Sequence, residues 1–555
     1  MAGKFVQATY PSDDISRRRL PIEKFAPSIW ADTFTSFSFD IQAQEKRSKA
    51  IESLKEKVRE MIIAGGSNHE LNEKLILIDT VERLGLAYHF KHEIEEQLES
   101  IASNLSEHND LYTSALRFRI LRQHHYLVSS SVFNKFMDQD GKFDEILSRD
   151  VKGLLSLFEA SQVRIHGEDI MEEGLAFTTH HLNALAQTLD CPLQDQVKRA
   201  LEHPLHRNFS RIEVRKYISF YEKDCLHNKV ILELAMLDFT YLQNLYKKEL
   251  CDLCRWWDNI DLMSKLTYAR DRVPEIYVWS LVVYFEPKDS LSRLAVAKCT
   301  IIASIFDDMY DNYATVEEAE AFTKILERWD IDEMDRLPDY MKIVYKFILS
   351  TYEEFVCEAS KRGRLFAAPY VREVIKELSR GYNNELKWFL GVQMPTLEAY
   401  NANIIITSVV FLLTTPALLG MKSATDEVFH WLLNRPKLVL AAARIGRLLD
   451  DLGSDKREGR EGQMLTAVTM YMKQHGVTKQ EALNKFAEIV EDSWKDINSE
   501  WCNLPSYIPR EVANLPLNFA RASEIFYKSS EDGYTSPEKG MATQMADLLV
   551  LPLIV

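Results

Sequence analysis

An all-α fold is predicted by two features of this sequence of 555 residues. Residues that interrupt helices are scarce, since 19 glycines and 17 prolines amount to about 3% each, against averages of about 7% and 5%. Apolar residues recur at steps of three and four, whereas strand-like alternation is not evident. The length is several times the usual domain size of about 100 to 150 residues, which indicates two or more cores or one unusually large one.

The first predicted helix lies between residues 51 and 62. Its apolar face consists of Ile51, Leu54, Val58, Met61 and Ile62. Charged residues separate these positions, and Gly65-Gly66 would end the helix. Similar amphipathic patterns follow at residues 75–84, 151–163 and 230–245, separated by short polar loops. No fixed-period repeat is evident, so a solenoid has no support.

A domain boundary is predicted near residue 232. The polar segment 221–229 precedes a new amphipathic run, although no linker rich in proline or glycine marks the position. The boundary divides the chain into an N-terminal α-helical domain, residues 1–232, and a C-terminal domain, residues 233–555. Both lengths lie near the usual range for single domains.

Composition and charge exclude two classes of protein. The chain is 46% hydrophobic and 27% charged, which is typical of a globular protein and excludes wholesale disorder. Its net charge is −16 and no stripe of lysine and arginine stands out, so we expect no nucleic-acid partner. An anionic substrate would therefore have to be held locally, by metal ions or by a few placed arginines.

Cysteine usage and apolar stretches indicate a cytoplasmic protein without a membrane span, which we expect to be a monomer. The seven cysteines are odd in number and scattered, unlike a secreted disulfide framework, and Cys251 and Cys254 are interpreted as ordinary thiols. The first 20 residues lack the apolar core of a signal peptide. The most apolar internal stretch, residues 404–420, is interrupted by Pro416 and is too short to cross a bilayer.

The first acidic motif follows the apolar stretch 294–306. On a helix, Asp307 and Asp311 lie one turn apart on the same face, with Asp308 beside them. Burying such a cluster is costly unless a cation neutralises it, and oxygen ligands favour a hard ion such as Mg²⁺. Taken alone, the motif is equally consistent with a solvated acidic helix end.

The second acidic motif places Asp450, Ser454 and Glu458 at four-residue spacing, so that two carboxylates and a hydroxyl share one helix face. Two such faces could oppose each other and hold a diphosphate between metal ions. Without the first motif, a mixed-charge exposed stretch would be the better interpretation.

A third group contains Arg270, Arg272 and Trp279. Guanidinium groups present forked donors that suit diphosphate oxygens, and a leaving diphosphate gains negative charge. An aromatic face attracts a cation without offering a lone-pair nucleophile that would trap a carbocation. A buried tryptophan is nevertheless more often structural than catalytic.

Together these motifs resemble those of plant class I terpene synthases, and the sesquiterpene cyclases match best. The segments that carry the resemblance are FAPSIW at 25–30, RDR at 270–272, FEP at 285–287, DDMYD at 307–311, RWD at 328–330, LPDYMK at 337–342, DDLGSDKRE at 450–458 and DGYT at 532–535. The likeness covers over nine-tenths of the chain, and the ordered combination is specific although each piece is not.

The resemblance implies a C-terminal class I terpenoid synthase bundle and an N-terminal α-barrel. It also implies farnesyl diphosphate as the substrate and Mg²⁺ as the cofactor, expected as three ions for which Mn²⁺ could substitute. The implied metal ligands are Asp307, Asp308, Asp311, Asp450, Ser454 and Glu458. The implied diphosphate and cavity contacts are Arg270, Arg272, Arg447, Trp279, Tyr527, Asp532 and Tyr534, with Thr407 and Ser408 where the family breaks a helix. The implied reaction is ionisation and cyclisation to a sesquiterpene hydrocarbon or alcohol by a carbon–oxygen lyase.

Three departures from the family pattern are present. Leu20-Pro21 keeps the usual register to Trp30, but Arg19 is displaced by one position, which puts N-terminal capping in doubt. Glu461-Gly462 stands where many relatives have Arg-Gly. The class II motif DxDD is absent, so the N-terminal domain is expected to be non-catalytic.

Several alternatives stay open. A monoterpene or diterpene synthase would use a shorter or longer substrate, and a prenyltransferase would be expected to carry a second DDxxD motif. A non-catalytic helical scaffold with an acidic surface is the remaining alternative. No motif determines the product, because about 1.4 kcal/mol between competing barriers shifts a branch ratio tenfold.

Overall fold

The structure is a computed structural model that describes residues 25–26, 28–30, 32–64, 68–103, 110–393, 395–461, 467–527 and 532–553. Within α-helices it leaves the side chains of residues 68–71, 397, 454–461, 473 and 539 undescribed. All regular elements in the described part are helical, apart from an isolated bridge between Met137 and Phe143. The predicted all-α fold class is confirmed.

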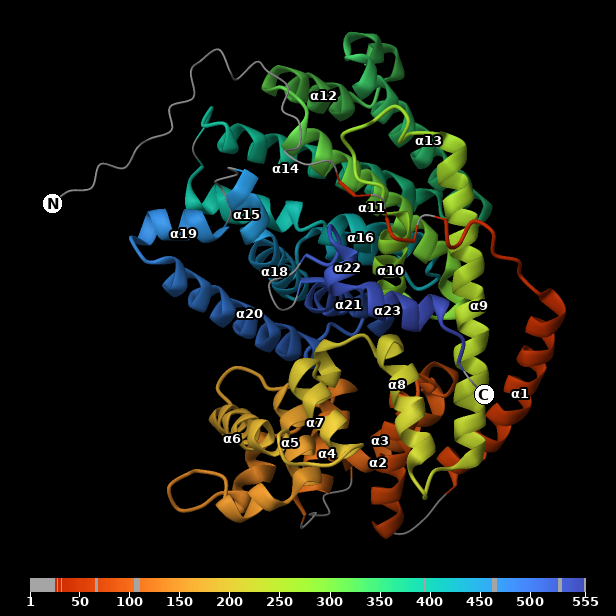
Figure 1. Ribbon diagram of the computed structural model, residues 1–555, viewed down its shortest axis with the longest axis vertical. Helices are drawn as coiled ribbons and strands as arrows, with labels where there is room; N and C mark the ends of the chain where they lie inside the picture. Colours follow the sequence, from red (N-terminus) through yellow and green to blue (C-terminus); the bar gives the residue numbers. More distant parts are fainter. Residues whose placement is uncertain are drawn as a thin grey trace.

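The described residues of the N-terminal region form eight α-helices, which gather in the lower half of Figure 1. They are α1 (Ile41–Ile63), α2 (Asn68–Arg83), α3 (Lys91–Ser103), α4 (Leu111–Gln123), α5 (Val151–Ser161), α6 (Asp169–Leu185), α7 (Leu193–Glu202) and α8 (Ser210–Lys223). Short 3₁₀ turns are η1 (Ala87–His89), η2 (Ser130–Phe136), η3 (Glu145–Arg149) and η4 (Leu205–Arg207). Two buried apolar clusters form the core of this region.

The predicted amphipathic segments coincide with helices. Segment 51–62 lies within α1, where Asp40 caps the N-terminus by accepting a hydrogen bond from the amide of Ala43 at 2.9 Å. Gly65-Gly66, which we expected to end this helix, lies outside the described residues. Segments 75–84 and 151–163 correspond to α2 and α5, each ending within two residues of the expected position.

The C-terminal region surrounds one large apolar core and fills the upper half of Figure 1. Its α-helices are α9 (Lys229–Ile260), α10 (Val273–Val283), α11 (Ser290–Asn312), α12 (Val316–Arg328), α13 (Asp339–Lys361), α14 (Ala368–Phe389), α15 (Leu397–Thr407), α16 (Val410–Ala417), α17 (Asp426–Leu433), α18 (Lys437–Glu461), α19 (Ala467–His475), α20 (Lys479–Cys502), α21 (Arg510–Tyr527), α22 (Pro537–Gly540) and α23 (Ala542–Met545). Shorter turns are η5 (Pro287–Asp289), η6 (Ile331–Arg336), η7 (Leu365–Ala367), η8 (Leu418–Gly420) and the π-helical η10 (Ala546–Val550).

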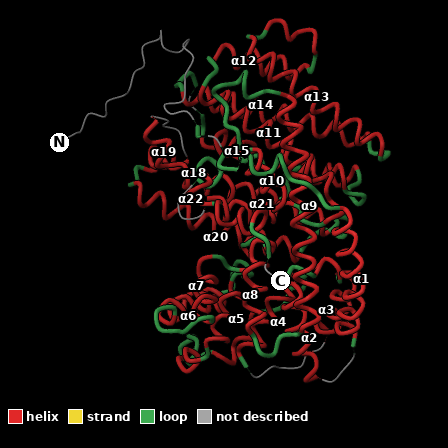
Figure 2. Tube along the Cα trace, turned by 45° about the vertical axis from the view of Figure 1, so that its right-hand side comes forward, coloured by secondary structure: helices red, strands yellow, loops and turns green. Residues whose placement is uncertain are grey.

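Helix α9 joins the two regions. It begins at Lys229, so the boundary expected near residue 232 falls in its first turn. Its early residues, such as Leu234 and Phe239, pack in the N-terminal core, whereas Tyr246 and Leu250 pack in the C-terminal core. Figures 1 and 2 both show this long helix beside α1, with which it is in contact. The chain therefore passes between the two cores inside a continuous helix.

Polar contacts also connect the two regions through α20. The amide of Asn498 donates hydrogen bonds to the carbonyls of Gln162 and Arg164 at 3.0 and 2.8 Å. The carboxylate of Glu491 accepts from Arg164 at 2.7 Å and from Arg207 at 2.6 Å. These contacts fix α20 against the N-terminal helices.

A buried charge cluster anchors α9 to α10 and α11. Glu249 accepts hydrogen bonds from Arg293 at 2.7 and 2.9 Å and from the hydroxyl of Tyr277 at 2.7 Å. The side chain of Arg293 is fully buried. Its charge therefore depends on Glu249 for compensation.

Replacing Glu249 with glutamine is expected to lower the free energy of unfolding by about 3–5 kcal/mol, because the charge of Arg293 would remain buried without a counter-ion. Urea denaturation followed by tryptophan fluorescence measures the change. Asp252→Asn, which breaks the exposed α9 pair with Lys248, is the matched control and should cost less than about 0.5 kcal/mol. Equal effects of the two variants would contradict the assigned role of Glu249.

Among the described residues, no helix taken singly is both long and apolar enough to cross a membrane. The bent pair Glu398–Thr407 and Val410–Gly420 meets the length and composition criteria jointly, with a 42° bend. Residues Val410–Ala417 of this pair are all buried within the protein.

Candidate active site

A cavity inside the C-terminal bundle collects most of the residues that the sequence singled out. It is lined by side chains from α10, α11, α14, α15, α18 and α21 and from the segment around residue 532. The predicted residues at its wall are Arg270, Trp279, Asp307, Asp311, Thr407, Ser408, Arg447, Asp450, Tyr527, Asp532 and Tyr534. Residues separated by more than 260 positions in the sequence therefore meet in one cavity.

Helix α11 presents the first acidic motif at its C-terminal end. The helix is buried along most of its length, and Asp307 and Asp311 reach the cavity one turn apart. Asp450 reaches the same cavity from α18, and Glu385 reaches it from α14. The side chains of Ser454 and Glu458 lie outside the described residues, although the backbone of α18 continues through both positions.

Asp308, predicted as a metal ligand, does not line the cavity. Its side chain is fully buried and accepts a hydrogen bond from the backbone amide of Arg270 at 2.7 Å. The guanidinium Nε of Arg270 lies 3.0 Å from its other oxygen. Burial raises the pKa of Asp308, and the nearby Asp307 acts in the same direction, whereas Arg270 opposes the shift. Asp308 thus positions Arg270.

Asp451 repeats this arrangement in the second acidic motif. It is fully buried, accepts a hydrogen bond from the amide of Ala467 at 3.1 Å and pairs with Arg447 at 2.6 Å. In each Asp-Asp pair the first carboxylate faces the cavity and the second holds an arginine. Successive helical residues point about 100° apart, so one pair can serve both purposes.

Arg270 lines the cavity and contacts several of the elements around it. It pairs with Asp307 and donates a hydrogen bond to the hydroxyl of Thr535 at 2.9 Å. Its guanidinium carbon lies 4.9 Å from the ring centre of Phe25 and 5.3 Å from that of Tyr534. Burial lowers its pKa, but Asp308 and Asp307 outweigh burial and raise it well above the usual range, so Arg270 stays charged.

Arg272, predicted to bind substrate, does not line the cavity either. Its guanidinium donates hydrogen bonds to the carbonyls of Ala26 at 2.8 Å and Thr535 at 2.9 Å. Ser28 donates to Glu275 at 2.8 Å in the same area. Arg272 therefore connects the segment at Ala26 to the 532–535 segment, whereas Arg19, Leu20 and Pro21 lie outside the described residues. Arg272 links the two segments instead of facing the cavity.

Aromatic rings form another part of the cavity wall. Trp279 stacks on Phe526, with ring centres 4.4 Å apart, and lies 5.9 Å from Phe519 and 6.2 Å from Tyr527. The hydroxyl of Tyr534 donates a hydrogen bond to Ser304 at 2.6 Å. Burial raises the pKa values of Tyr527 and Tyr534, so both phenols stay protonated.

Asp532 shapes its own segment, residues 532–535. One of its carboxylate oxygens accepts hydrogen bonds from the amides of Tyr534 at 3.0 Å and Thr535 at 2.9 Å. This turn places Tyr534 at the cavity wall and Thr535 against Arg270 and Arg272. Asp532 therefore acts on its own segment as well as lining the cavity.

The expected helix break is present between α15 and α16. Helix α15 ends at Thr407, and Val409 adopts a left-handed conformation with φ of 60° before α16 begins at Val410. A β-branched residue rarely adopts this conformation, which indicates local strain. Thr407 and Ser408 both line the cavity at the break.

Sequence inspection missed Glu385. It accepts a hydrogen bond from Thr407 at 2.6 Å, and burial raises its pKa, as do Asp451 and Asp307, whereas Arg447 lowers it. No motif surrounds Glu385 in the sequence. The nearby feature that could have pointed to Glu385 is Tyr382, which also lines the cavity and precedes Glu385 by about one helical turn on α14.

The carboxylates suit a hard divalent cation. Asp307, Asp311, Glu385 and Asp450 bring only oxygen donors to the cavity, the ligand type that Mg²⁺ prefers. Within the described part of the chain, no three Asp, Glu, His or Cys side chains are grouped closely enough to hold a metal by themselves. The residues therefore fit an ion that shares its coordination shell with substrate oxygens.

Two family models match the chain. The model of the terpene synthase N-terminal domain matches residues 29–201, and that of the terpene synthase family metal-binding domain matches residues 258–496. The second match includes both acidic motifs, Arg270 and Arg447. The two matches lie on either side of the predicted domain boundary.

Similar proteins match over nearly the full length. Tau-cadinol synthase of Lavandula angustifolia is 45% identical over 525 residues, which cover 93% of this chain and 94% of that protein. Gamma-cadinene synthase of Ocimum basilicum is 47% identical over 541 residues, covering 97% and 98%. The crystal structure of isoprene synthase from grey poplar leaves (Populus x canescens), in complex with three Mg²⁺ ions and dimethylallyl-S-thiolodiphosphate, has a TM-score of 0.85 at 31% identity and covers 95% of this chain and 99% of that chain.

Proposed function

This chain belongs to the terpene synthase family, and we propose that it ionises farnesyl diphosphate and cyclises the resulting carbocation to a sesquiterpene hydrocarbon or alcohol. The enzyme is a lyase that breaks a carbon–oxygen bond and releases diphosphate. One observation carries the proposal: Asp307, Asp311 and Asp450 meet Arg270, Arg447 and Trp279 at a single cavity. Charged side chains that can bind a diphosphate, directly or through metal ions, therefore lie beside an aromatic ring that can stabilise a carbocation.

The metal-binding family model indicates dependence on a divalent metal. We propose Mg²⁺, in three ions as in the isoprene synthase complex, with Mn²⁺ as a substitute. Asp307 and Asp311 would hold metal on one side of the diphosphate, and Asp450 on the other, with Ser454 and Glu458 completing the second set as the family resemblance implies. When bound, Mg²⁺ would supply Lewis-acid stabilisation of the departing diphosphate.

The two arginines bind the charged end of the substrate. Arg270 and Arg447 keep their charge because buried carboxylates hold them, and their forked donors suit diphosphate oxygens. As the carbon–oxygen bond breaks, the diphosphate accumulates charge next to these donors, which favours the transition state over the ground state.

The aromatic side chains stabilise the hydrocarbon cation without forming a covalent bond to it. Trp279, Phe519 and Tyr527 line the cavity, and their π systems attract a cation. Arg270 and Arg272 contact Thr535 together with Phe25 and Ala26, and we expect these segments to keep out bulk water that would capture the cation. The cavity in which the hydrocarbon tail of the substrate folds is shaped by Tyr534, by Asp532 and by the helix break at Thr407 and Ser408.

Substrate length is tested by incubating the enzyme with geranyl, farnesyl and geranylgeranyl diphosphates in parallel. We expect kcat/KM to be at least about tenfold higher for farnesyl diphosphate, which corresponds to about 1.4 kcal/mol of differential transition-state binding. Gas chromatography identifies the products. A preference for the C10 or C20 substrate would contradict the proposed substrate and favour a monoterpene or diterpene synthase.

We also propose that residues 1–232 form a non-catalytic domain and that the enzyme is a cytoplasmic monomer. The lack of a DxDD motif supports the first point. A truncated protein would not test it cleanly, since α9 is shared by both cores. Sedimentation of the full chain measures the oligomeric state, and a stable dimer would contradict a monomer.

A further inference from the structure

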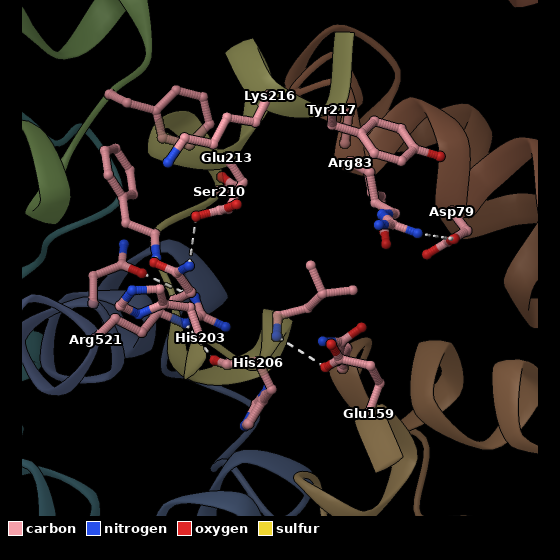
Figure 3. Close-up of a pocket in the computed structure, with 18 of the residues that line it drawn as sticks. Asp79, Arg83, Glu159, His203, His206, Ser210, Glu213, Lys216, Tyr217 and Arg521 are labelled. Carbon is pink, nitrogen blue, oxygen red and sulfur yellow. Dashed lines mark hydrogen bonds and ion pairs between the residues drawn. The ribbon is translucent and has the colours of Figure 1, made fainter. Parts of the chain in front are cut away.

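A second and larger cavity lies between the N-terminal region and the C-terminal bundle. Its volume is about 1060 Å³, and it shares no lining residue with the catalytic cavity. Helices α2, α5, α7 and α8 line it from one side, and α21 and the end of α10 line it from the other. Figure 3 shows the hollow surrounded by side chains from both regions.

Arg521 of α21 reaches into this cavity from the catalytic region, as Figure 3 shows. Its Nε donates to the carbonyl of His206 at 2.8 Å and its Nη1 donates to the side chain of Asn518 at 3.0 Å. No described carboxylate lies within 4.0 Å of its guanidinium, and no described group accepts a hydrogen bond from Nη2. Burial lowers the pKa of Arg521 to about 10, so it stays charged at neutral pH.

Other basic side chains at the cavity differ from Arg521. Seven of these arginine and lysine side chains lie close to a carboxylate in the described part of the chain. Two more, Lys198 and Lys223, are exposed. The seven pairs are Arg83 and Arg119 with Asp79, Arg199 with Glu213, Lys91 with Glu286, Arg510 with Glu95, and Arg215 and Lys216 with Asp547. His206 carries no charge at neutral pH, because burial and the neighbouring Arg521 lower its pKa to about 3. Arg521 is partly exposed, and the described residues supply no counter-ion for its positive charge.

The rest of the wall indicates what kind of anion would fit. Phe209, Val283 and Leu517 contribute buried apolar surface, whereas Glu159 and Glu213 place carboxylates in the same hollow. Acidic neighbours disfavour a multiply charged ligand such as a diphosphate, since Arg521 alone would have to balance its charge. The volume far exceeds that of a single inorganic anion and matches the size of small-molecule sites.

We propose that this interdomain cavity binds an organic monocarboxylate with an apolar body, whose carboxylate pairs with the Nη1–Nη2 edge of Arg521. That edge offers parallel N–H donors, which suit the two oxygens of a carboxylate. The apolar body lies against Phe209, Val283 and Leu517, so the ligand contacts both regions of the chain. Such a site is separate from the metal-dependent chemistry of the catalytic cavity.

Calorimetric titration of the full-length protein with dodecanoate, below its micelle concentration, tests the proposal. We expect one molecule to bind per chain, and Arg521→Gln to weaken binding at least about tenfold through loss of charge-assisted hydrogen bonds. Dodecan-1-ol, which has the same chain without the charge, should bind equally to both proteins. Equal dodecanoate affinity in wild type and Arg521→Gln would overturn the proposal.

Two further variants and one competition titration distinguish this cavity from dodecanoate binding elsewhere on the protein. Arg510→Gln removes a cavity arginine that already pairs with Glu95 at 3.0 Å and should leave dodecanoate binding unchanged. Ser210→Trp adds bulk to the hollow without removing the guanidinium and should weaken binding. Saturation with Mg²⁺ and farnesyl-S-thiolodiphosphate should not displace dodecanoate, whereas displacement would place it in the catalytic cavity and overturn the proposal. Product formation from farnesyl diphosphate by each variant verifies that it is folded.

Discussion

Replacing Asp307 with alanine is expected to reduce Mg²⁺-dependent product formation at least about 100-fold, more than is typical for residues that only support a metal ligand. Asp307 is the part-exposed carboxylate of its pair, it lines the cavity, and Arg270 lies directly against it. Its loss would remove a predicted metal ligand and one of the two carboxylate partners of Arg270. Initial rates with farnesyl diphosphate over a range of Mg²⁺ concentrations measure both effects.

The matched control for Asp307 is Asp339→Ala at the start of α13, where the side chain is 97% exposed. It removes the same charge from the protein but should leave the rate and its Mg²⁺ dependence unchanged. A loss of metal affinity in Asp307→Ala should appear as a higher Mg²⁺ concentration at half-maximal rate. Full activity at unchanged Mg²⁺ concentration would exclude Asp307 as a metal ligand.

Replacing Arg447 with alanine is expected to lower kcat by about 10²–10³-fold, the range observed when one preorganised donor to a developing negative charge is removed. Arg447 is largely buried, lines the cavity and stays charged, because Asp451 and then Glu385 raise its pKa against the effect of burial. Its contact with the diphosphate should strengthen as the carbon–oxygen bond breaks. The effect should therefore fall on kcat more than on KM.

Asp451 provides a second test of the same site. Asp451→Asn should also lower kcat, but by less than Arg447→Ala does. The guanidinium of Arg447 remains in this variant, and only the carboxylate that anchors it is weakened. The double variant should lose less activity than the product of the two single losses, because both act on one interaction. Arg444→Ala, one turn earlier on α18 and 41% exposed, is the control and should retain activity. Additive losses would show that Asp451 acts independently of Arg447.

Local sequence patterns predicted much of the fold because helices impose a short repeat. The apolar spacing of residues 51–62 is sufficient to place α1, since every position on its buried face is within a few residues of the next. The domain boundary was harder to predict, because α9 is amphipathic throughout and changes cores without any change in its repeat. Periodicity shows that a face is buried, but not which core buries it.

The sequence by itself determined the all-α class, the two acidic motifs and the family to which they belong. These properties depend on spacings of three, four and eight residues, which a helix converts directly into a shared face. Only the tertiary structure decided that Asp308 and Asp451 hold arginines, that Arg272 links the segments at Ala26 and Thr535, and that Glu385 joins the site. It also created the interdomain cavity at Arg521. Each of these features depends on contacts between side chains far apart in the chain, and local spacing carries no information about which distant surface a side chain meets.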